Sequence, residues 1–201
     1  TVKEDYTFDT PVLGDLDYQG KKIILVTAHR RENLGEPLRN ICEALKELVT
    51  KYEDVQIVYP VHLNPAVREV AFEVLGNLPR VSLIDPLDVQ ELHNAMNRCY
   101  MVLTDSGGLQ EEAPSLGKPV LVLRNETERP EAVEAGTVKV AGVNKDTIIK
   151  LASELIESAA EYNKMAKAVN PYGDGEASRR IVEAILYEFG HIEKRVGDFS
   201  V

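Results

Sequence analysis

The stretch from Thr104 to Glu112 (TDSGGLQEE) combines residue types that suit the binding of a phosphorylated ligand. Ser106 belongs to the types that cap a helix through a hydroxyl, and Gly107 and Gly108 leave the backbone open to close approach. A helix start offers free N–H groups and the positive end of the helix dipole, which favour a phosphate. Glu112 follows Gly108 by four residues and so shares its helix face, where a carboxylate could accept hydrogen bonds from two sugar hydroxyls.

This stretch also has a purely structural interpretation, in which Ser106 caps a helix and the glycines only allow close packing. Two nucleotide-binding motifs are absent from it. The glycines lack the Gly-x-Gly-x-x-Gly spacing of dinucleotide-binding loops, and Gly117-Lys118 is followed by Pro119 rather than by the Ser or Thr of a P-loop.

Short apolar runs that alternate with amphipathic segments must position this stretch. They span residues 22–28, 55–59, 81–84, 100–103, 120–123 and 137–140. Near-continuous apolar runs are typical of strands buried on both faces of a parallel sheet. Their alternation with helices predicts an α/β fold with a doubly wound, Rossmann-like parallel sheet. We expect an irregular lead-in over residues 1–20, this domain over 21–190 and a polar tail over 191–201.

Cap signals and apolar spacing locate several of the helices. Asp88 and Glu91 resemble a capping box, and Asn144 is placed to cap the helix that follows it. A last helix is indicated by the spacing of Ala177, Ile181, Ala184 and Ile185.

In a doubly wound sheet, ligands bind at the carboxyl ends of the strands, near the switch in strand order. Candidate residues follow five of the predicted strands at that end: His29 and Arg30, His62, residues 87–92, residues 106–112, and Arg129. Arginines there can meet phosphates, and an imidazole, which changes its protonation near neutral pH, could donate a proton to a leaving phosphate. The residues by themselves therefore indicate a nucleoside diphosphate, or a sugar attached to one, as the ligand.

Each of these side chains also has a structural interpretation. His29 and His62 could only order their own loops, and Arg129 could be ion-paired among the carboxylates of its own loop. We expect Glu32 to pair with one of the two arginines just before it. We expect Asp105 to order a loop rather than to act as a catalyst.

The composition excludes several classes of protein. The 201 residues, 44% of them hydrophobic, are enough for one domain with a buried core. A net charge of −10 argues against general nucleic-acid binding, and no apolar run approaches the ~18 residues of a spanning helix. We therefore expect neither nucleic acid nor a membrane as a partner. Cys42 and Cys99 are interpreted as buried thiols in a reducing, cytoplasmic compartment.

No metal site or nucleophilic triad is predicted. The His, Cys, Asp and Glu residues do not show a recognisable ligand spacing, and no serine lies in a nucleophile-elbow motif. His93 and His191 fall on faces expected to be exposed, and no role is assigned to them.

Five motifs occur in order along the chain: TAHRREN at 27–33, PVHLNP at 60–65, TDSGGLQEEAP at 104–114, ERPEA at 128–132 and NPYGDG at 170–175. In this order and spacing they closely resemble the non-hydrolysing UDP-N-acetylglucosamine 2-epimerases. The resemblance implies a two-domain GT-B architecture of which this chain is the carboxyl-terminal half. The amino-terminal domain of the same enzyme would then be its missing partner, and the intact enzyme would be a homodimer.

The resemblance implies an isomerase that interconverts UDP-GlcNAc and UDP-ManNAc for cell-surface polysaccharide precursors. In this family UDP is eliminated to leave a 2-acetamidoglucal and is then added back, with the C2 proton on the other face. No cofactor is implied. Because the carboxylates that move the C2 proton would lie in the amino-terminal domain, we expect this chain to bind UDP but not to epimerise alone.

Roles for the diphosphate and ribose follow from the resemblance residue by residue. Ser106, Gly107 and Gly108 would hold the diphosphate. Glu112 would accept bonds from the ribose hydroxyls, and Arg129 would contact the diphosphate side.

The resemblance extends to three further parts of the site. The backbone at Leu92, with Leu87 nearby, would hold the uracil, although the family often has an aromatic residue at position 92. His29 matches the catalytic histidine, near the departing UDP. Arg30 and His62 match residues that bind a second, allosteric UDP-GlcNAc in bacterial members.

Three alternatives remain open from the sequence. A GT-B glycosyltransferase would also bind a UDP-sugar on its carboxyl-terminal domain. A non-catalytic domain could bind a sugar nucleotide as a sensor. A hydrolysing epimerase would release free ManNAc.

Overall fold

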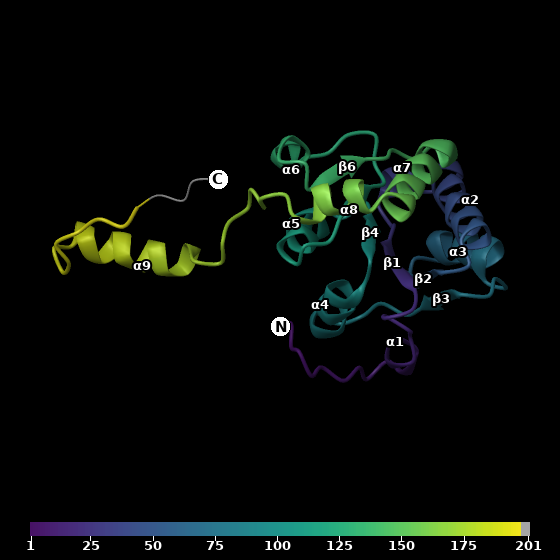
Figure 1. Ribbon diagram of the computed structural model, residues 1–201, viewed down its shortest axis with the longest axis horizontal. Helices are drawn as coiled ribbons and strands as arrows, with labels where there is room; N and C mark the ends of the chain where they lie inside the picture. The colour runs from purple at the N-terminus through teal and green to yellow at the C-terminus, as the bar shows by residue number, and fades with distance from the viewer. Residues whose placement is uncertain (198–201) are drawn as a thin grey trace.

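The computed structural model describes residues 1–197 and contains one six-stranded sheet (Figure 1). Its strands are β1 (Lys22–Thr27), β2 (Val55–Pro60), β3 (Val81–Ile84), β4 (Met101–Thr104), β5 (Val120–Val122) and β6 (Val138–Val140). The order across the sheet is β3-β2-β1-β4-β5-β6, and every neighbouring pair is parallel. This order is that of a doubly wound sheet, with its switch point between β1 and β4. The predicted fold class is confirmed.

Helices follow the strands as the sequence predicts. They are α1 (Pro11–Gly14), α2 (Glu36–Lys51), α3 (Pro65–Leu75), α4 (Val89–Arg98), α5 (Gly107–Ser115), α6 (Pro130–Glu134), α7 (Lys145–Glu157), α8 (Ala159–Ala166) and α9 (Ala177–Glu188), with a 3-10 turn at Arg31–Asn33. Asn144 caps α7 as expected, because its side chain accepts a hydrogen bond from the backbone N–H of Thr147.

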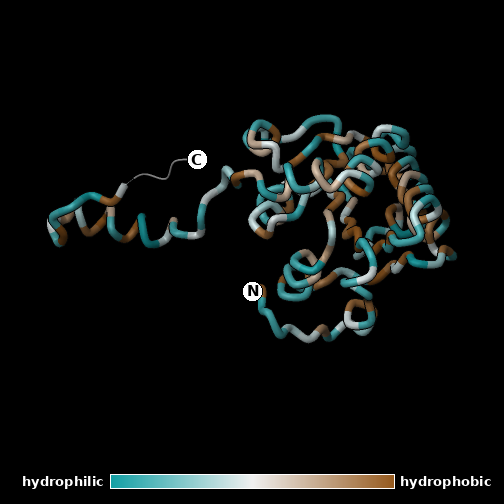
Figure 2. Tube along the Cα trace, in the orientation of Figure 1, coloured by the Kyte–Doolittle hydropathy of each residue, from teal (hydrophilic) through white to brown (hydrophobic). Residues whose placement is uncertain are grey.

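Two layers of helices cover the two faces of the sheet, and each layer forms its own apolar core. Alternate residues of β1 divide between them: Ile24 and Val26 pack with α2, α3 and α7, whereas Ile23 and Leu25 pack with α4, α5 and α6. Figure 2 shows hydrophobic residues concentrated in the strands between the layers. Burying each such aliphatic side chain stabilises the fold by roughly 1.5–3 kcal/mol. Burial on both faces explains why the strands read as continuous apolar runs.

Residues 1–20 are more ordered than the expected irregular lead-in. They contain α1, and Phe8 and Leu13 are buried in the core that includes α4. The Glu91 carboxylate accepts hydrogen bonds from the backbone N–H (2.8 Å) and hydroxyl (2.5 Å) of Thr10. Asp88 caps α4 as predicted, but Glu91 is turned to Thr10, so the segment is tied to the body through a contact between distant residues.

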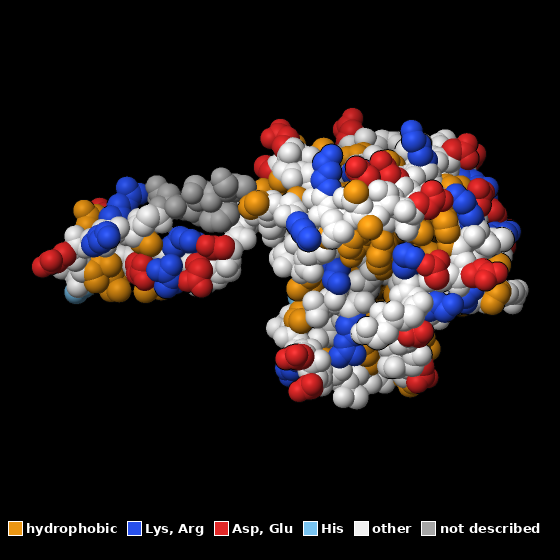
Figure 3. All heavy atoms as spheres, in the orientation of Figure 1, with side chains coloured by type: hydrophobic (Ala, Val, Ile, Leu, Met, Phe, Trp, Pro, Cys, Tyr) orange, Lys and Arg blue, Asp and Glu red, His pale blue; other side chains and the backbone are white. Residues whose placement is uncertain are grey.

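The chain after α7 differs from the prediction in two ways. Helix α8, which was not predicted, packs on the body, with the rings of Tyr162 and Tyr100 stacked at 4.3 Å. Helix α9, which was predicted, projects away from the body and buries none of its residues (Figures 1 and 3). Three of its apolar side chains, Ile181, Val182 and Ile185, are more than half exposed. The predicted tail falls partly on residues 198–201, outside the described residues.

The described part of the chain has no helix long and apolar enough to cross a membrane. Cys42 and Cys99 are buried free thiols, as predicted. Burial raises the pKa of each thiol to about 12, because desolvation disfavours the thiolate, and both thiols therefore stay neutral at physiological pH.

Candidate functional site

The carboxyl ends of β1 and β4 lie side by side at the switch point of the sheet. Thr27 pairs with Thr104 in the strand register, and their hydroxyl oxygens are 2.6 Å apart. After these residues the chain leaves toward α2 on one face and toward α5 on the other. Diverging loops of this kind leave a crevice at the sheet edge, where ligands bind in open α/β sheets.

Asp105, the first residue after β4, fixes the loop that follows β1. Its side chain is fully buried, and Oδ2 accepts hydrogen bonds from the backbone N–H of His29 (2.8 Å), the backbone N–H of Arg30 (2.7 Å) and the Asn33 amide (3.0 Å). Such bonds offset the cost of burying a carboxylate. The expected loop-ordering role of Asp105 is confirmed.

His29 lies over this carboxylate. Oδ1 of Asp105 is buried and makes no hydrogen bond with the described residues, and it lies 3.8 Å from Nδ1 of His29. The His29 side chain is 40% exposed, and its ring stacks on that of His62, with centroids 5.1 Å apart and planes 5° from parallel. His29 thus presents an accessible imidazole above a buried negative charge.

His62 orders its own loop and also contacts His29. Its Nδ1 accepts a hydrogen bond from the backbone N–H of Asn64 (3.0 Å), as the structural interpretation predicts. Because β1 and β2 are neighbours in the sheet, the rings of His29 and His62 stack where the two strands end. The loop-ordering interpretation of His62 is therefore confirmed, and its role in ligand binding stays a prediction.

The first turn of α5 is flanked by two guanidinium groups from different loops. A Cβ built on Gly107 would lie 3.8 Å from Nη2 of Arg30 and 3.9 Å from Nη2 of Arg129. A Cβ on Gly108 would lie 3.5 Å from Oε1 of Glu112. The backbone N–H groups of the helix start and both positive charges thus surround one small space, a combination that suits a phosphate.

Ser106 occupies the N-cap position, but its hydroxyl makes no capping hydrogen bond, so the predicted cap is wrong. Its backbone N–H instead donates to the hydroxyl of Thr104 (2.9 Å). The turn before α5 is therefore held by the Thr104 hydroxyl, and the Ser106 hydroxyl lies at the start of the helix without capping it.

Arg129 is ion-paired, but not within its own loop. Its Nε donates to the carboxylate of Glu111 on α5, and Nη1 donates to the backbone carbonyl of Glu128 (3.0 Å). Glu111 raises the pKa of Arg129 further above its ordinary value, because the carboxylate stabilises the charged form. The structural interpretation of Arg129 as an ion-paired residue is therefore confirmed, but its partner is a carboxylate of α5 rather than one of its own loop.

The expected pairing of Glu32 with Arg30 or Arg31 is also wrong. Glu32 pairs with Nε of Arg124 at 2.9 Å. Within residues 1–197, Arg30 makes no ion pair. Its guanidinium beside Gly107 therefore remains available for an anionic ligand.

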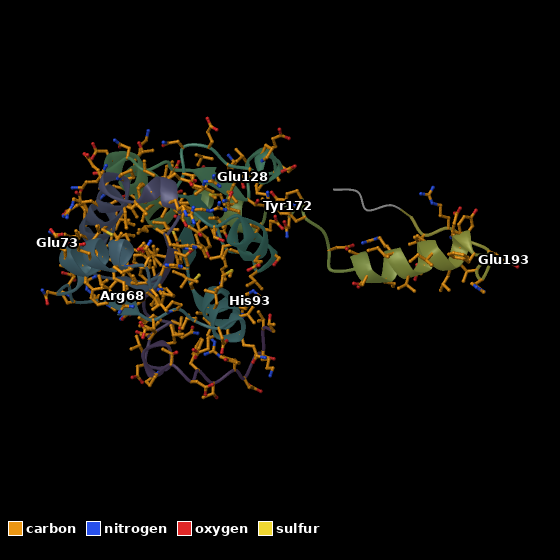
Figure 4. The ribbon with its side chains drawn as sticks, turned by 180° about the vertical axis from the view of Figure 1, so that it is seen from behind. Arg68, Glu73, His93, Glu128, Tyr172 and Glu193 are labelled. Atoms are coloured by element: carbon orange, nitrogen blue, oxygen red, sulfur yellow. The ribbon has the colours of Figure 1, made fainter. Side chains whose placement is uncertain are left out.

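Glu112 points from the second turn of α5 toward α4. Its Oε2 lies 3.2 Å from Nε2 of His93, whose Nδ1 is hydrogen-bonded to the Thr1 hydroxyl at 2.6 Å (Figure 4 labels His93). The Glu112 side chain is 46% exposed and can still accept further hydrogen bonds. His93, to which the sequence assigned no role, belongs to the site.

Residues 1–186 match the family model described as UDP-N-acetylglucosamine 2-epimerase. The chain belongs to the UDP-N-acetylglucosamine 2-epimerase family. The protein of that name from Bacillus subtilis is 54% identical over 200 residues, which cover 100% of the chain and 52% of the relative.

Two solved structures of this family contain nucleotide ligands. A structure of S. aureus MnaA with UDP matches with a TM-score of 0.90 and 52% identity, over 100% of this chain and 54% of that one. The UDP-GlcNAc 2-epimerase of Neisseria meningitidis, bound to UDP-GlcNAc, matches with a TM-score of 0.79 and 51% identity, over 83% of this chain and 45% of that one. The chain spans about half the length of these relatives and corresponds to the carboxyl-terminal half of the family's enzymes.

The two leucines expected near the uracil of this family lie on the α4 side of the site. Leu87 precedes α4 and Leu92 lies in its first turn, and both are half-buried against the core beneath α4 and α5. Leu92 directly precedes His93, which contacts Glu112. The residues expected to hold uracil and ribose therefore lie on neighbouring helices.

Sequence reasoning missed two side chains of the site, Glu111 and His93. Glu111 lies in the TDSGGLQEE stretch, but its partner Arg129 is on another loop. His93 could have been found from topology, because α4 and α5 are consecutive helices on the same face of a doubly wound sheet.

Proposed function

We propose that this chain is the UDP-binding half of a non-hydrolysing UDP-N-acetylglucosamine 2-epimerase that interconverts UDP-GlcNAc and UDP-ManNAc. The observation that carries the proposal is the convergence at the switch point. There the start of α5 lies between Arg30 and Arg129, and Glu112 follows one turn along the same helix. Membership of the family supports the choice of nucleotide.

The diphosphate is proposed to lie at the start of α5. The amides of Gly107 and Gly108 and the hydroxyl of Ser106 donate hydrogen bonds to its oxygens, and Arg129 offsets its charge. Glu112 accepts hydrogen bonds from the ribose hydroxyls.

The uracil is proposed to lie along the backbone at Leu92, with Leu87 beneath it. The half-burial of both side chains supports an apolar floor there. Since Leu92 directly precedes His93, the partner of Glu112, uracil and ribose would be held by adjacent elements.

The reaction is proposed to proceed by elimination and re-addition. The C2 proton leaves and the C1–O bond to UDP breaks, which yields UDP and a 2-acetamidoglucal. UDP then adds back to C1 while C2 takes a proton on the opposite face. His29, backed by the Asp105 carboxylate, serves the departing phosphate oxygen as a proton donor. The groups that move the C2 proton are assigned to the amino-terminal half, so this chain alone is inactive.

Arg30 and His62 are proposed to contribute to a second, allosteric UDP-GlcNAc site. His62 stacks on His29, the guanidinium of Arg30 lies beside Gly107, and Arg30 makes no ion pair within residues 1–197. The intact enzyme is proposed to act as a cytoplasmic homodimer in the synthesis of cell-surface polysaccharide precursors.

Calorimetric titration with UDP tests the nucleotide site. The unaltered chain is expected to bind UDP, and Glu112→Ala to lose roughly 1–3 kcal/mol, since it removes a charged acceptor. Glu73→Ala is the matched control, because Glu73 is an exposed carboxylate paired with Arg39 away from the site. Failure of the unaltered chain to bind UDP, or unchanged binding by Glu112→Ala, would contradict the proposed nucleotide site. Turnover of UDP-GlcNAc by this chain alone would show that the amino-terminal half is not required for catalysis.

A further inference from the structure

Gln110 is a fully buried polar side chain in the first turn of α5. Its Nε2 donates to the backbone carbonyl of Ser106 (3.2 Å), and its Oε1 accepts a hydrogen bond from the hydroxyl of Thr127 (2.5 Å). A buried amide is costly unless it is hydrogen-bonded. Here both ends of the amide are bonded, and the two partners lie on different loops.

Thr127 carries this connection onward to Arg129. The Thr127 hydroxyl donates to Gln110 and accepts from the backbone N–H of Arg129 (3.0 Å). Three hydrogen bonds thus run from the Ser106 carbonyl to the Arg129 amide. They join the loop before α5 to the loop before α6.

Consecutive residues of α5 therefore hold Arg129 at two points. Gln110 acts on its main chain through Thr127, and Glu111 binds Nε of its side chain. Arg129 is the N-cap residue of α6 and its side chain makes no capping bond, so the Thr127 hydroxyl is what fixes its backbone N–H.

We propose that Gln110 and Thr127 are positioning residues that set the Arg129 guanidinium against the amides of Gly107 and Gly108. The inference rests on the proposed function, since those groups are the proposed diphosphate site. The Arg129 Nη2 lies 3.9 Å from the position of a Cβ on Gly107. If the loop were released from Gln110, the positive charge of Arg129 would remain but would no longer be held at its distance from the start of α5. Affinity for the diphosphate would therefore fall, while contacts to the nucleoside would not change.

Substitutions at Thr127 separate positioning from packing. Thr127→Val keeps the shape but removes the hydroxyl, and Thr127→Ser is the matched control that keeps it. By calorimetry we expect Thr127→Val to weaken UDP binding about three- to tenfold, the effect of losing one or two neutral hydrogen bonds. Uridine binding is expected to stay unchanged, and Thr127→Ser is expected to bind both ligands as the unaltered chain does.

Two further measurements tie the effect to Arg129. Hydrogen exchange of the Arg129 amide is expected to be faster in Thr127→Val than in Thr127→Ser, with or without a ligand. In an Arg129→Ala background, Thr127→Val is expected to cause no additional loss of UDP affinity, because no guanidinium is left to position.

Each opposite result overturns the inference. Unchanged UDP affinity in Thr127→Val, or an equal loss for UDP and uridine, would show that the hydroxyl does not position Arg129 for the diphosphate. An additive loss in the Arg129→Ala background would do the same. If the unaltered chain failed to bind UDP, the proposed function would fall and this inference with it, a result distinct from any difference among the variants.

Discussion

The buried carboxylate of Asp105 faces the imidazole of His29 across the junction of β1 and β4, with Oδ1 3.8 Å from Nδ1. Oδ2 is fully engaged by the loop, whereas Oδ1 makes no hydrogen bond with the described residues. At 3.8 Å the two atoms are too far apart for a hydrogen bond. One carboxylate therefore both fixes the backbone at His29 and places an unbonded oxygen beside its imidazole.

Asp105→Asn is expected to impair catalysis in the enzyme that contains both halves. An asparagine can still accept hydrogen bonds from the loop, but it removes the negative charge that faces His29. We expect kcat to fall about 10²-fold or more, because a general acid loses its electrostatic partner, while UDP affinity of this chain changes little. The measurement is a comparison of kcat with UDP titration.

Asp85→Asn is the matched control for this substitution, since Asp85 is a 78% exposed carboxylate that pairs with Arg68. It should leave both quantities unchanged. A kcat for Asp105→Asn within twofold of the unaltered enzyme would show that His29 does not depend on the carboxylate.

Gly107→Ala is expected to block the ligand without harming the fold. The added Cβ would meet only the ends of two arginine side chains, at 3.8 and 3.9 Å, so the free protein has room for it. Alanine is also favoured over glycine in a helix by up to ~1 kcal/mol. We expect equal or higher stability in urea and at least tenfold weaker UDP binding.

Gly136→Ala provides the opposite pattern for comparison. Gly136 has a φ of +78°, which only glycine adopts readily, and it lies just after α6. This substitution should destabilise the chain by about 1 kcal/mol without changing UDP affinity. Equal UDP affinity of Gly107→Ala and the unaltered chain would place the phosphate elsewhere.

Tyr59, which is bonded to the start of the His29 loop, makes the stability of the chain fall at alkaline pH. Its buried hydroxyl donates to the backbone carbonyl of Ala28 (2.5 Å), and burial raises the pKa of Tyr59 well above its ordinary value of 10.0. The unfolded chain therefore loses this proton at a lower pH than the folded chain does. The contribution of protonated Tyr59 to the free energy of unfolding is complete below pH ~10. It is lost as the pH rises above that value, by up to about 1.4 kcal/mol per pH unit.

Tyr59→Phe is expected to reduce this alkaline slope by up to one proton, as measured by urea unfolding between pH ~9 and ~11. At pH ~7 it should destabilise the chain by about 1–3 kcal/mol, because the Ala28 carbonyl loses a buried donor. An unchanged slope would show that another buried group dominates. Tyr18 and Tyr162, whose pKa values burial raises to about 12, are the nearest candidates.

The sheet and most helices were predictable because their signals are local. Residues 22–27 read as a strand in sequence because both faces of β1 are buried. Helix α1 and the burial of Phe8 escaped prediction because their apolar residues show no period and depend on contact with α4. Helix α8 was missed although its cap, Ser158, is of a favoured residue type.

The site was predictable in its residue types but not in its pairings. The carboxyl ends of parallel strands meet at one edge, so His29, Ser106 and Arg129 could be brought together from topology alone. The carboxylate that pairs with Arg129 could not be predicted, because its pairing with Glu111 depends on how a loop folds back over α5. Alternative ion pairs between exposed side chains differ little in free energy, so the separation of two residues in the sequence does not predict which pair forms.

The apolar side chains of α9 should contribute almost nothing to the stability of the body. Ile185 is 52% exposed and α9 buries no residue, whereas Leu45 on α2 is fully buried in the core. Ile185→Ala is therefore expected to change the free energy of unfolding by less than about 0.5 kcal/mol, against about 2–5 kcal/mol for Leu45→Ala. Urea unfolding followed by far-UV circular dichroism measures both. A loss of more than about 1 kcal/mol in Ile185→Ala would show that α9 packs against the chain's own body in solution, because only a buried side chain loses that much on truncation.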